Sequence, residues 1–127
     1  TLARSRYLYQ PTALYNKTGS SYASDGFKIS NTNFPQITNN PEDVMVCWPI
    51  LWTLSRTPVN NITRGRVTTV FDMQQPQWAT HTTQGYEHLK IGTGRQFFLE
   101  NALELLDEPG EFYFDKTTKK MYYYPYE

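Results

Sequence analysis

The chain has 127 residues, of which 12 are basic and 12 acidic, so its formal net charge is zero, and aromatic residues make up 16% of it. Nucleic-acid-binding domains normally carry a basic excess, and a membrane-spanning helix needs roughly 18 consecutive apolar residues, so we expect no nucleic-acid partner and no membrane span. The length suits one domain, residues 1–127, and its aromatic-rich composition favours strands over helices.

The first forty residues predict short strands joined by polar segments. Partial alternation of side chains predicts a strand over residues 1–10, whereas residues 11–26, rich in Ser, Thr, Gly and Asn, predict a loop. A short strand is expected over the sequence GFKIS, residues 26–30. Asn40 is followed by Pro41 and two acidic residues, which predicts a single helical turn with Asn40 as its N-cap.

The middle of the chain predicts buried strands and a hairpin. The apolar run over residues 44–59 is interrupted by Pro49 and predicts one buried strand on each side of the proline. Cys47, the single cysteine, lies in this run and is expected to behave as a small buried apolar side chain. Residues 59–73 predict a hairpin whose turn lies near Gly65.

The last third predicts one helix and an aromatic hairpin. Residues 74–85 predict a loop and residues 86–92 a strand. Apolar residues recur at helical spacing over 97–110, which predicts the one helix, ended by Pro-Gly. Residues 110–114 and 120–125 predict a hairpin with one face on the core and tyrosine hydroxyls reaching water on the other. Together these elements predict a mainly β fold, an antiparallel β-sandwich with one short helix.

Side chains that could do chemistry are present, but none forms a diagnostic pattern. Half of the acidic residues lie between Glu100 and Asp115. A glycosidase needs two carboxyl groups ~5–10 Å apart, and Glu100 and Glu104 would face one groove if they were one helical turn apart. Carboxylates on an exposed helix are common, so no catalytic residue is assigned. His81 and His88 have no third ligand beside them, so no metal ligand and no cofactor is assigned, although loop oxygens could still bind calcium.

Three residues are candidates for roles at the surface. Trp78 lies in a predicted loop and is the tryptophan most expected to be exposed, where an indole can stack on a sugar ring or contact a neighbouring domain. N-glycosylation sequons begin at Asn16 and Asn61, in polar contexts that resemble turns. Such short sequons also arise by chance, and they matter only in a secretory pathway.

Three segments resemble a known group of proteins. The sequence ENALELLDEPGEFYFDKTTKKMYYYP, residues 100–125, resembles a recurrent segment of secreted proteins with a right-handed parallel β-helix, which include pectate-lyase-like and β-xylosidase-type glycoside hydrolases. Residues 2–7 and 40–62 are similar to further stretches of the same group, so the resemblance covers nearly the whole chain. The chain departs from the pattern at Phe112, where the group has Trp, and at Lys119, where its hairpin has Gly.

The resemblance implies a β-sandwich that is normally inserted near the start of a β-helix, so both chain ends should lie close together. The chain begins with Thr1, which also indicates a mature or excised piece. The implied function is that of an accessory domain of a secreted carbohydrate-active protein, which braces the β-helix and shapes a polysaccharide cleft without being catalytic alone. Its implied partners are the parent β-helix domain, which would carry any glycoside hydrolase activity, and polysaccharide.

Two other functions stay open. One is a structural or adhesive extracellular glycoprotein module without enzymatic activity, and the other is an autonomous sugar-binding module. Paired carboxylates on the coils of an adjoining β-helix would favour the enzyme, and their absence would favour the structural module. Saturable binding of xylo- or pecto-oligosaccharides to the domain would favour the third function.

Overall fold

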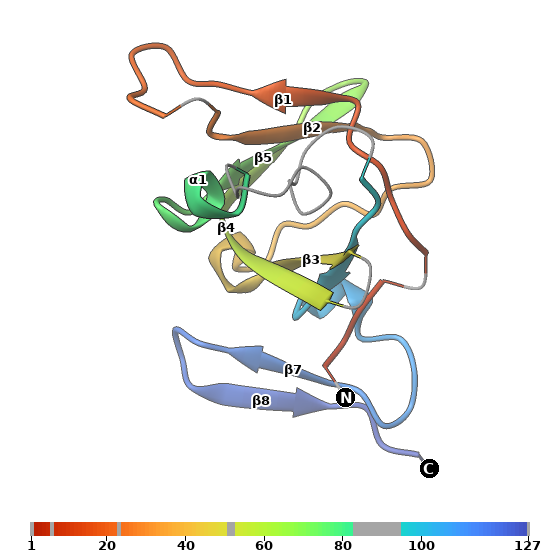
Figure 1. Cartoon of the computed structure of the whole chain (residues 1–127). Coiled ribbons are helices and arrows are strands. Elements are labelled where there is room, and N and C mark those ends of the chain that lie inside the picture. The colour runs from red at the N-terminus through yellow and green to blue at the C-terminus, as the bar shows by residue number, and fades with distance from the viewer. Residues whose placement is uncertain (1, 6, 23, 51–52, 83–94, 127) are drawn as a thin grey trace.

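The structure is a computed structural model that describes residues 2–5, 7–22, 24–50, 53–82 and 95–126. The chain is mainly β, with antiparallel sheets and, in the described residues, one short α-helix, as in β-sandwich-like domains (Figure 1). The elements follow in the order β1 (Ala13–Tyr15), β2 (Gly26–Ser30), η1 (Pro41–Asp43), β3 (Met45–Ile50), β4 (Thr53–Arg64), β5 (Thr68–Met73), α1 (Gln77–Thr82), β6 (Phe98–Glu100), η3 (Leu103–Leu105), β7 (Phe112–Asp115) and β8 (Lys120–Tyr123).

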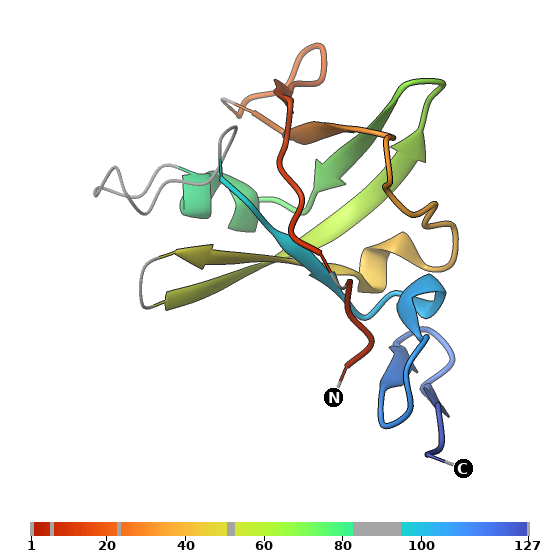
Figure 2. The ribbon, with the colours of Figure 1, turned by 90° about the vertical axis from the view of Figure 1, so that its right-hand side faces the viewer.

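The long strand β4 connects the two halves of the main sheet. Six strands follow the order β1-β2-β5-β4-β3-β6, and every neighbouring pair is antiparallel. The first half of β4 pairs with β3, and its second half pairs with β5. The register of the β4–β5 pairing shifts between Val59 and Asn61. A shift of this kind bends a strand, and Figure 2 shows the two halves of the sheet running in different directions.

An aromatic cluster fills the space between the two halves of the sheet. Phe27 stacks on Phe71 with ring centroids 4.8 Å apart and also contacts Trp48, Trp78 and Phe97. All five side chains are fully buried. Rings of this size bury a large apolar area each, so the high aromatic content of the sequence supplies most of the core of this small domain.

The hairpin β7–β8 forms a separate two-stranded sheet where the chain ends meet. Leu2 forms a parallel bridge to Phe112, and Tyr123 pairs with Phe112 from the other side. The beginning and the end of the described chain therefore flank the same strand, as expected from the resemblance. Figures 1 and 2 show both ends of the ribbon beside this hairpin.

Most of the predicted strands are confirmed. Strand β2 covers the predicted residues 26–30, and β4 and β5 form the hairpin predicted over residues 59–73. The apolar run forms two strands as predicted, but Pro49 does not separate them, because β3 continues through it to Ile50. The amide of Gly65 donates to the carbonyl of Thr68 in its turn, 2.7 Å away. Strands β7 and β8 confirm the C-terminal hairpin, but Tyr113 lies on its buried face, whereas Phe112 and Phe114 are partly exposed. The strand predicted over residues 86–92 lies outside the described residues.

The helix predicted over residues 97–110 is wrong. Strand β6 and the 3-10 turn η3 occupy the stretch instead. Phe97 and Leu99 are buried while Phe98 between them is partly exposed, which is the alternation of a strand, and β6 pairs with β3. Asn101 then adopts a left-handed φ of 62°, which a helix cannot continue through. Sheet pairing and this residue outweigh the helical spacing of the leucines.

The remaining differences lie in segments expected to be loops or a strand. Helix α1 lies in the predicted loop 74–85, and the amide of Ala79 donates to the side-chain oxygen of Gln75, 2.9 Å away. Strand β1 lies in the predicted loop 11–26. The described residues of 1–10 contribute isolated bridges rather than a continuous strand, because the segment crosses from β7 to β6. The turn η1 forms where it was predicted, but Asn40 makes no side-chain cap.

Candidate functional site

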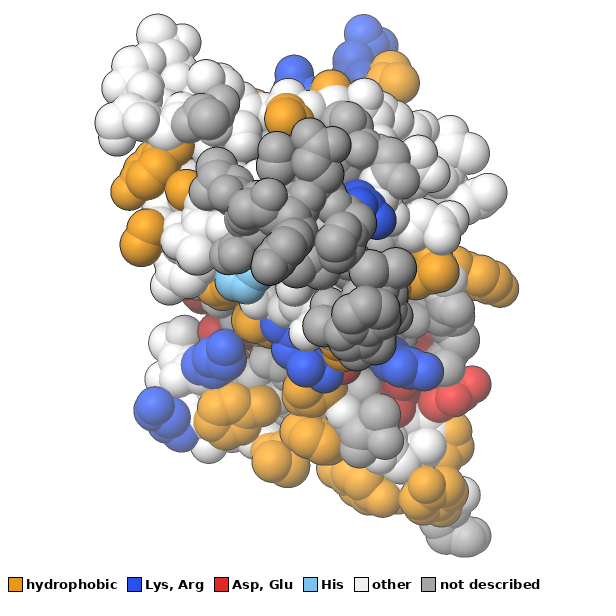
Figure 3. All heavy atoms as spheres, in the orientation of Figure 1, with side chains coloured by type: hydrophobic (Ala, Val, Ile, Leu, Met, Phe, Trp, Pro, Cys, Tyr) orange, Lys and Arg blue, Asp and Glu red, His pale blue; other side chains and the backbone are white. Residues whose placement is uncertain are grey.

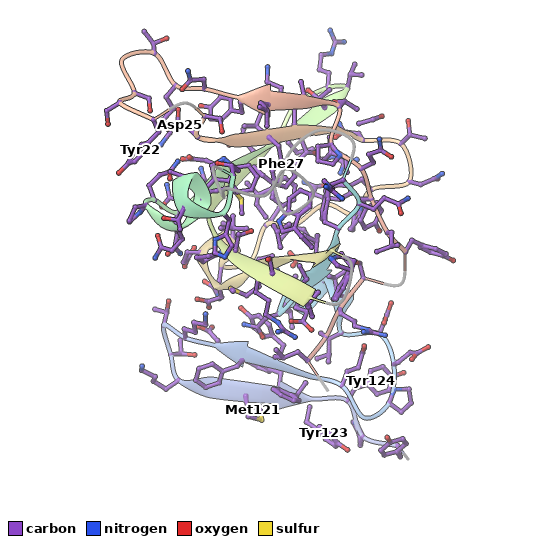
Figure 4. The ribbon with its side chains drawn as sticks, in the orientation of Figure 1. Tyr22, Asp25, Phe27, Met121, Tyr123 and Tyr124 are labelled. Carbon is purple, nitrogen blue, oxygen red and sulfur yellow. The ribbon has the colours of Figure 1, made fainter. Side chains whose placement is uncertain are left out.

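Five exposed apolar side chains of β8 and the residues that follow it make up the hairpin face: Met121, Tyr122, Tyr123, Tyr124 and Tyr126. Met121 and Tyr123 lie on one side of the strand, and Tyr122, which stacks on Tyr113, lies on the other. Met121 is 61% exposed, Tyr123 55% and Tyr126 80%. Figure 3 shows apolar side chains gathered over this end of the molecule, and Figure 4 shows Met121, Tyr123 and Tyr124 along it. Contiguous apolar patches on a protein surface mark interaction sites, so the hairpin face is a candidate contact surface.

The outer edge of β8 adds backbone groups to this surface. Strand β8 pairs with β7, and no further strand lies on its other side in the described part of the chain. An open edge presents unpaired N–H and C=O groups that another strand can bind. A lone two-stranded hairpin is at best marginally stable in water, so contacts with the main sheet must hold β7 and β8 in place.

Asn101 attaches the hairpin to the main sheet. Its buried side-chain amide donates to the carbonyls of Asp43 (3.1 Å) and Phe114 (3.0 Å), and its side-chain oxygen accepts from the amide of Phe114 (2.9 Å). The side chain thus pairs with β7 as a neighbouring strand would. The carboxylate of Asp43, also buried, accepts from the amide of Lys116 at 3.0 Å.

Two further contacts secure the hairpin. The hydroxyl of Tyr113 accepts a hydrogen bond from the side-chain amide of Asn40 at 2.9 Å. Asn40 thus holds Tyr113 instead of capping the turn η1, as was predicted. Burial raises the pKa of Tyr113 above its usual value, so this phenol stays neutral at physiological pH. The amide of Ala3 donates to the carbonyl of Phe112 at 2.8 Å.

The turns of the hairpin are held by acidic side chains. Asp115 accepts from the amides of Thr117 (3.0 Å) and Thr118 (3.1 Å), and these bonds lower the pKa of its carboxyl group. Glu111 accepts from the amide of Glu108 at 3.2 Å, in the turn that precedes β7. Lys119 has a left-handed φ of 63°, the conformation expected from the glycine that the resemblance places there.

The carboxylates considered for catalysis contact different neighbours. Glu100 lies at the end of β6 and accepts from the guanidinium of Arg56 at 3.1 Å and from the thiol of Cys47 at 3.4 Å. Glu104 lies in η3, where one oxygen accepts from the amides of Thr38 (2.8 Å) and Asn39 (3.0 Å). Because no helix spans this stretch, the two groups are not one helical turn apart, and each holds a structural contact.

Burial determines the chemistry of these groups. Burial and then the adjacent Glu100 raise the pKa of the Cys47 thiol far above its usual value, so it is protonated at neutral pH and behaves as the expected small apolar side chain. Burial alone would raise the pKa of Glu104, but the donors at Thr38 and Asn39 outweigh it, and the net pKa is lowered.

Trp78 is not at the surface, so that prediction is wrong. Its side chain is 0% exposed, and its indole N–H donates to the hydroxyl of Ser24 at 3.0 Å. The reason is that α1 forms in the predicted loop and turns the indole into the aromatic cluster. Asn16 and Asn61 are both exposed, Asn61 on strand β4, and their glycosylation stays a prediction.

The histidines and the acidic groups do not assemble a metal centre in the part of the chain that the structure describes. His81 lies in α1, where its ring Nδ1 is 2.8 Å from the carbonyl of Gln77, and His88 lies outside the described residues. No three His, Cys, Asp or Glu side chains come together there. Of the described helices, none is long and apolar enough to cross a membrane.

Sequence reasoning missed the two residues that attach the hairpin, Asn101 and Asp43. A short polar residue directly after a strand could have indicated Asn101, because Asn adopts the left-handed conformation more readily than other non-Gly residues. No pattern in the sequence indicates that the Asp43 carboxylate binds a backbone amide 73 residues away.

A family model and a solved structure each match this chain. The family model described as GH141 insertion domain matches residues 28–126. A solved structure named "Glycoside hydrolase" aligns with a TM-score of 0.66 and 17% sequence identity, over 100% of this chain and 22% of that one. The likeness to that structure supports the fold, and the chain spans about a fifth of its length. No curated protein matches the sequence.

Proposed function

The chain belongs to the GH141 insertion domain family, and on that premise we propose that it is the accessory domain of a secreted, carbohydrate-active enzyme built on a right-handed parallel β-helix. It docks on that enzyme through the hairpin face, braces the first coils of the β-helix and walls the polysaccharide cleft. The observation that carries this proposal is the meeting of both chain ends at the hairpin face.

The position of the chain ends supports insertion into a larger body. Leu2 and Tyr123 flank opposite sides of Phe112, so the chain enters and leaves beside one strand. An inserted domain needs this arrangement, because its host chain must continue from nearly the point at which it was interrupted. The host body therefore lies at this end of the domain, next to β8.

The hairpin face provides the contact that such a body needs. Its methionine and tyrosines expose large apolar side chains beside the chain ends, and the outer edge of β8 has no strand against it among the described residues. Tyrosines suit an interface because the ring is buried while the hydroxyl still finds a polar partner. We take the remainder of the enzyme chain as the occupant, since it begins and ends there.

The carboxylates of this domain support a role without catalysis of its own. Glu100, Glu104 and Glu111 each bind structural donors within the domain, through Arg56, through Thr38 and Asn39, and through a turn amide. A pair of free carboxyl groups across a cleft, as glycoside hydrolysis requires, would then come from the β-helix.

The proposal is tested by charging the hairpin face in the complete enzyme. The variant Met121→Asp/Tyr123→Asp places two carboxylates where burial would leave them without partners. We expect the domain to undock, which would show as a separate unfolding transition at lower temperature, faster protease cleavage at both chain junctions and loss of polysaccharide hydrolysis.

The control is Tyr7→Asp, because Tyr7 is even more exposed than Met121 and Tyr123, at 74%, but lies outside the hairpin face. This control should leave the unfolding transition and the hydrolysis rate unchanged. If the double variant unfolds and hydrolyses polysaccharide as the parent does, the hairpin face does not dock and the proposal fails. Undocking without any change in hydrolysis would favour a purely structural module.

A further inference from the structure

A polar groove of about 620 Å³ lies at the other end of the domain from the hairpin face. One wall is the loop after β1, residues 17–22, and the other is formed by residues 73–75 after β5 together with Asn60 of β4. Figure 4 shows Tyr22 and Asp25 at this end, and Met121 and Tyr123 at the opposite end. The volume falls within the ~300–1,000 Å³ of typical small-molecule sites.

A buried carboxylate fixes the loop wall of the groove. Asp25 is 3% exposed and accepts from the amide of Lys17 (2.6 Å) and from the hydroxyl of Ser20 (2.8 Å). The hydroxyl of Ser20 in turn accepts from the amide of Tyr22 at 3.1 Å. The loop is therefore ordered before any ligand arrives, so binding does not have to bear the entropy cost of ordering it.

The opposite wall offers hydrogen-bond acceptors. Gln74 donates its side-chain amide to the carbonyl of Val59 (2.9 Å), and Asn60 donates to the carboxylate of Asp72 (3.0 Å). Each side-chain amide can still donate a second N–H and accept through its carbonyl oxygen. Among the described residues, the lining holds one cation, Lys17, and one anion, Asp25, and Lys17 is paired with Asp72 at 2.9 Å.

Tyr22 adds an aromatic surface at the rim. Its side chain is 37% exposed and lines the groove. An exposed aromatic ring can stack on the apolar face of a sugar ring while hydrogen bonds hold the hydroxyls. Met73 supplies a further apolar contact in the groove.

We propose that this groove binds a neutral oligosaccharide segment of the polysaccharide substrate. Sugar hydroxyls both donate and accept hydrogen bonds and so match the hydroxyl and amide groups of the walls, and the pyranose face matches the ring of Tyr22. A uronate-containing chain is disfavoured, because Lys17, the one cation among the described lining residues, is already paired with Asp72. The inference rests on the proposed function for the presence of a polysaccharide substrate, but it concerns a site remote from the docking surface.

The test uses the complete enzyme and three neutral hexasaccharides, of xylose, glucose and mannose, with hexagalacturonate as the charged comparison. Saturation with at least one neutral sugar should slow hydrogen exchange of the amides of residues 17–22, and hexagalacturonate should not. Tyr22→Ala should weaken that local binding about 2- to 12-fold, as expected for loss of an aromatic contact, and Tyr22→Trp should retain it. Tyr7→Ala, which removes a more exposed tyrosine outside the groove, should have no effect.

Hydrolysis separates the failure of this inference from the failure of the docking proposal. Tyr22→Ala should reduce the rate on long polysaccharide and leave the rate on a short glycoside unchanged, whereas undocking of the hairpin face would lower both. The inference is overturned if no neutral hexasaccharide protects the loop, if Tyr22→Ala binds as the parent does, or if hexagalacturonate binds as tightly as the neutral sugars.

Discussion

Lys119 occupies a backbone conformation that suits glycine. It lies in the turn between β7 and β8 with φ at 63°, and its amide donates to the carbonyl of Asp115 at 2.8 Å. In L-residues the left-handed region brings Cβ too close to the following carbonyl, at a cost of ~1–2 kcal/mol. The hairpin keeps its geometry in spite of this cost, because the carboxylate of Asp115 also accepts from the backbone amides of Thr117 and Thr118 in the same turn.

We therefore predict that Lys119→Gly stabilises the domain. Relief of the left-handed strain is partly offset by the greater freedom of glycine in the unfolded chain, which leaves a gain of about 0.5–1 kcal/mol in the free energy of unfolding, measurable in urea. Lys120→Gly is the control, since that residue lies in β8 and should lose about 0.5–1 kcal/mol instead. A loss of stability in Lys119→Gly would contradict the prediction.

Glu104 gives the domain a dependence on pH. Its pKa is lowered in the folded state, so the folded form binds the proton less readily than the unfolded chain does. The stabilisation it provides is therefore complete above the usual glutamate pKa of about 4.3 and is lost as the pH falls through the lower folded value.

We predict that Glu104→Gln is less stable than the parent at pH 7 and that the difference shrinks below pH of about 4.3. Urea unfolding of both proteins between pH 3 and 7 measures this difference. Glu42→Gln, which changes an exposed carboxylate at η1, should follow the parent over the whole range. A difference between Glu104→Gln and the parent that stays constant with pH would show that the carboxylate contributes only through its shape.

At the scale of elements, the attachment of β7 depends on Asn101 rather than on a sheet ladder. We predict that Asn101→Ala costs about 3–5 kcal/mol, because it leaves two carbonyls and one amide of the junction without their partners. Asn101→Gly keeps the left-handed backbone and should be about 1 kcal/mol less harmful. Hydrogen exchange should quicken first at Phe114; if it quickens uniformly over the chain, the junction is not a local unit.

The sequence predicts an element well where the local pattern of apolar and polar side chains alone determines the structure. The hairpin of residues 59–73 follows from alternation and from Gly65, and the hairpin of residues 110–125 follows from paired aromatic strands. The stretch 97–110 fails because its leucines fit a helix equally well, and only the pairing of β6 with the distant strand β3 decides between the two.

The same limit applies to the candidate site. The hairpin face could be anticipated from a tyrosine-rich ribbon, because its residues are adjacent in sequence. The groove beside Tyr22 could not, because it joins the loop after β1 to residues after β5, and their proximity depends on the pairing of β2 with β5. The prediction that Trp78 is exposed failed for a related reason. Its segment forms the helix α1 instead of a loop, and the helix places the indole in the core.

At the scale of the whole molecule, the two proposals assign different roles to the two ends of the domain. The hairpin face and both chain ends lie together, and the groove of residues 17–22 lies at the other end (Figure 4). If the hairpin face docks as proposed, the domain attaches at one end and leaves the other accessible. Removal from its host should therefore expose the hairpin face and leave the groove unchanged.

The last prediction follows from that exposure. We expect the 127-residue chain alone to self-associate through β8, because an open strand edge with apolar side chains pairs readily with a second copy. Tyr123→Lys places a charge on this edge and should weaken association by about tenfold or more in sedimentation equilibrium, whereas Tyr7→Lys, at an exposed site away from the edge, should not. Association that is equally strong in both variants would place the contact elsewhere, and a monomer at all concentrations would mean that the side chains of the hairpin face are too well hydrated to drive docking.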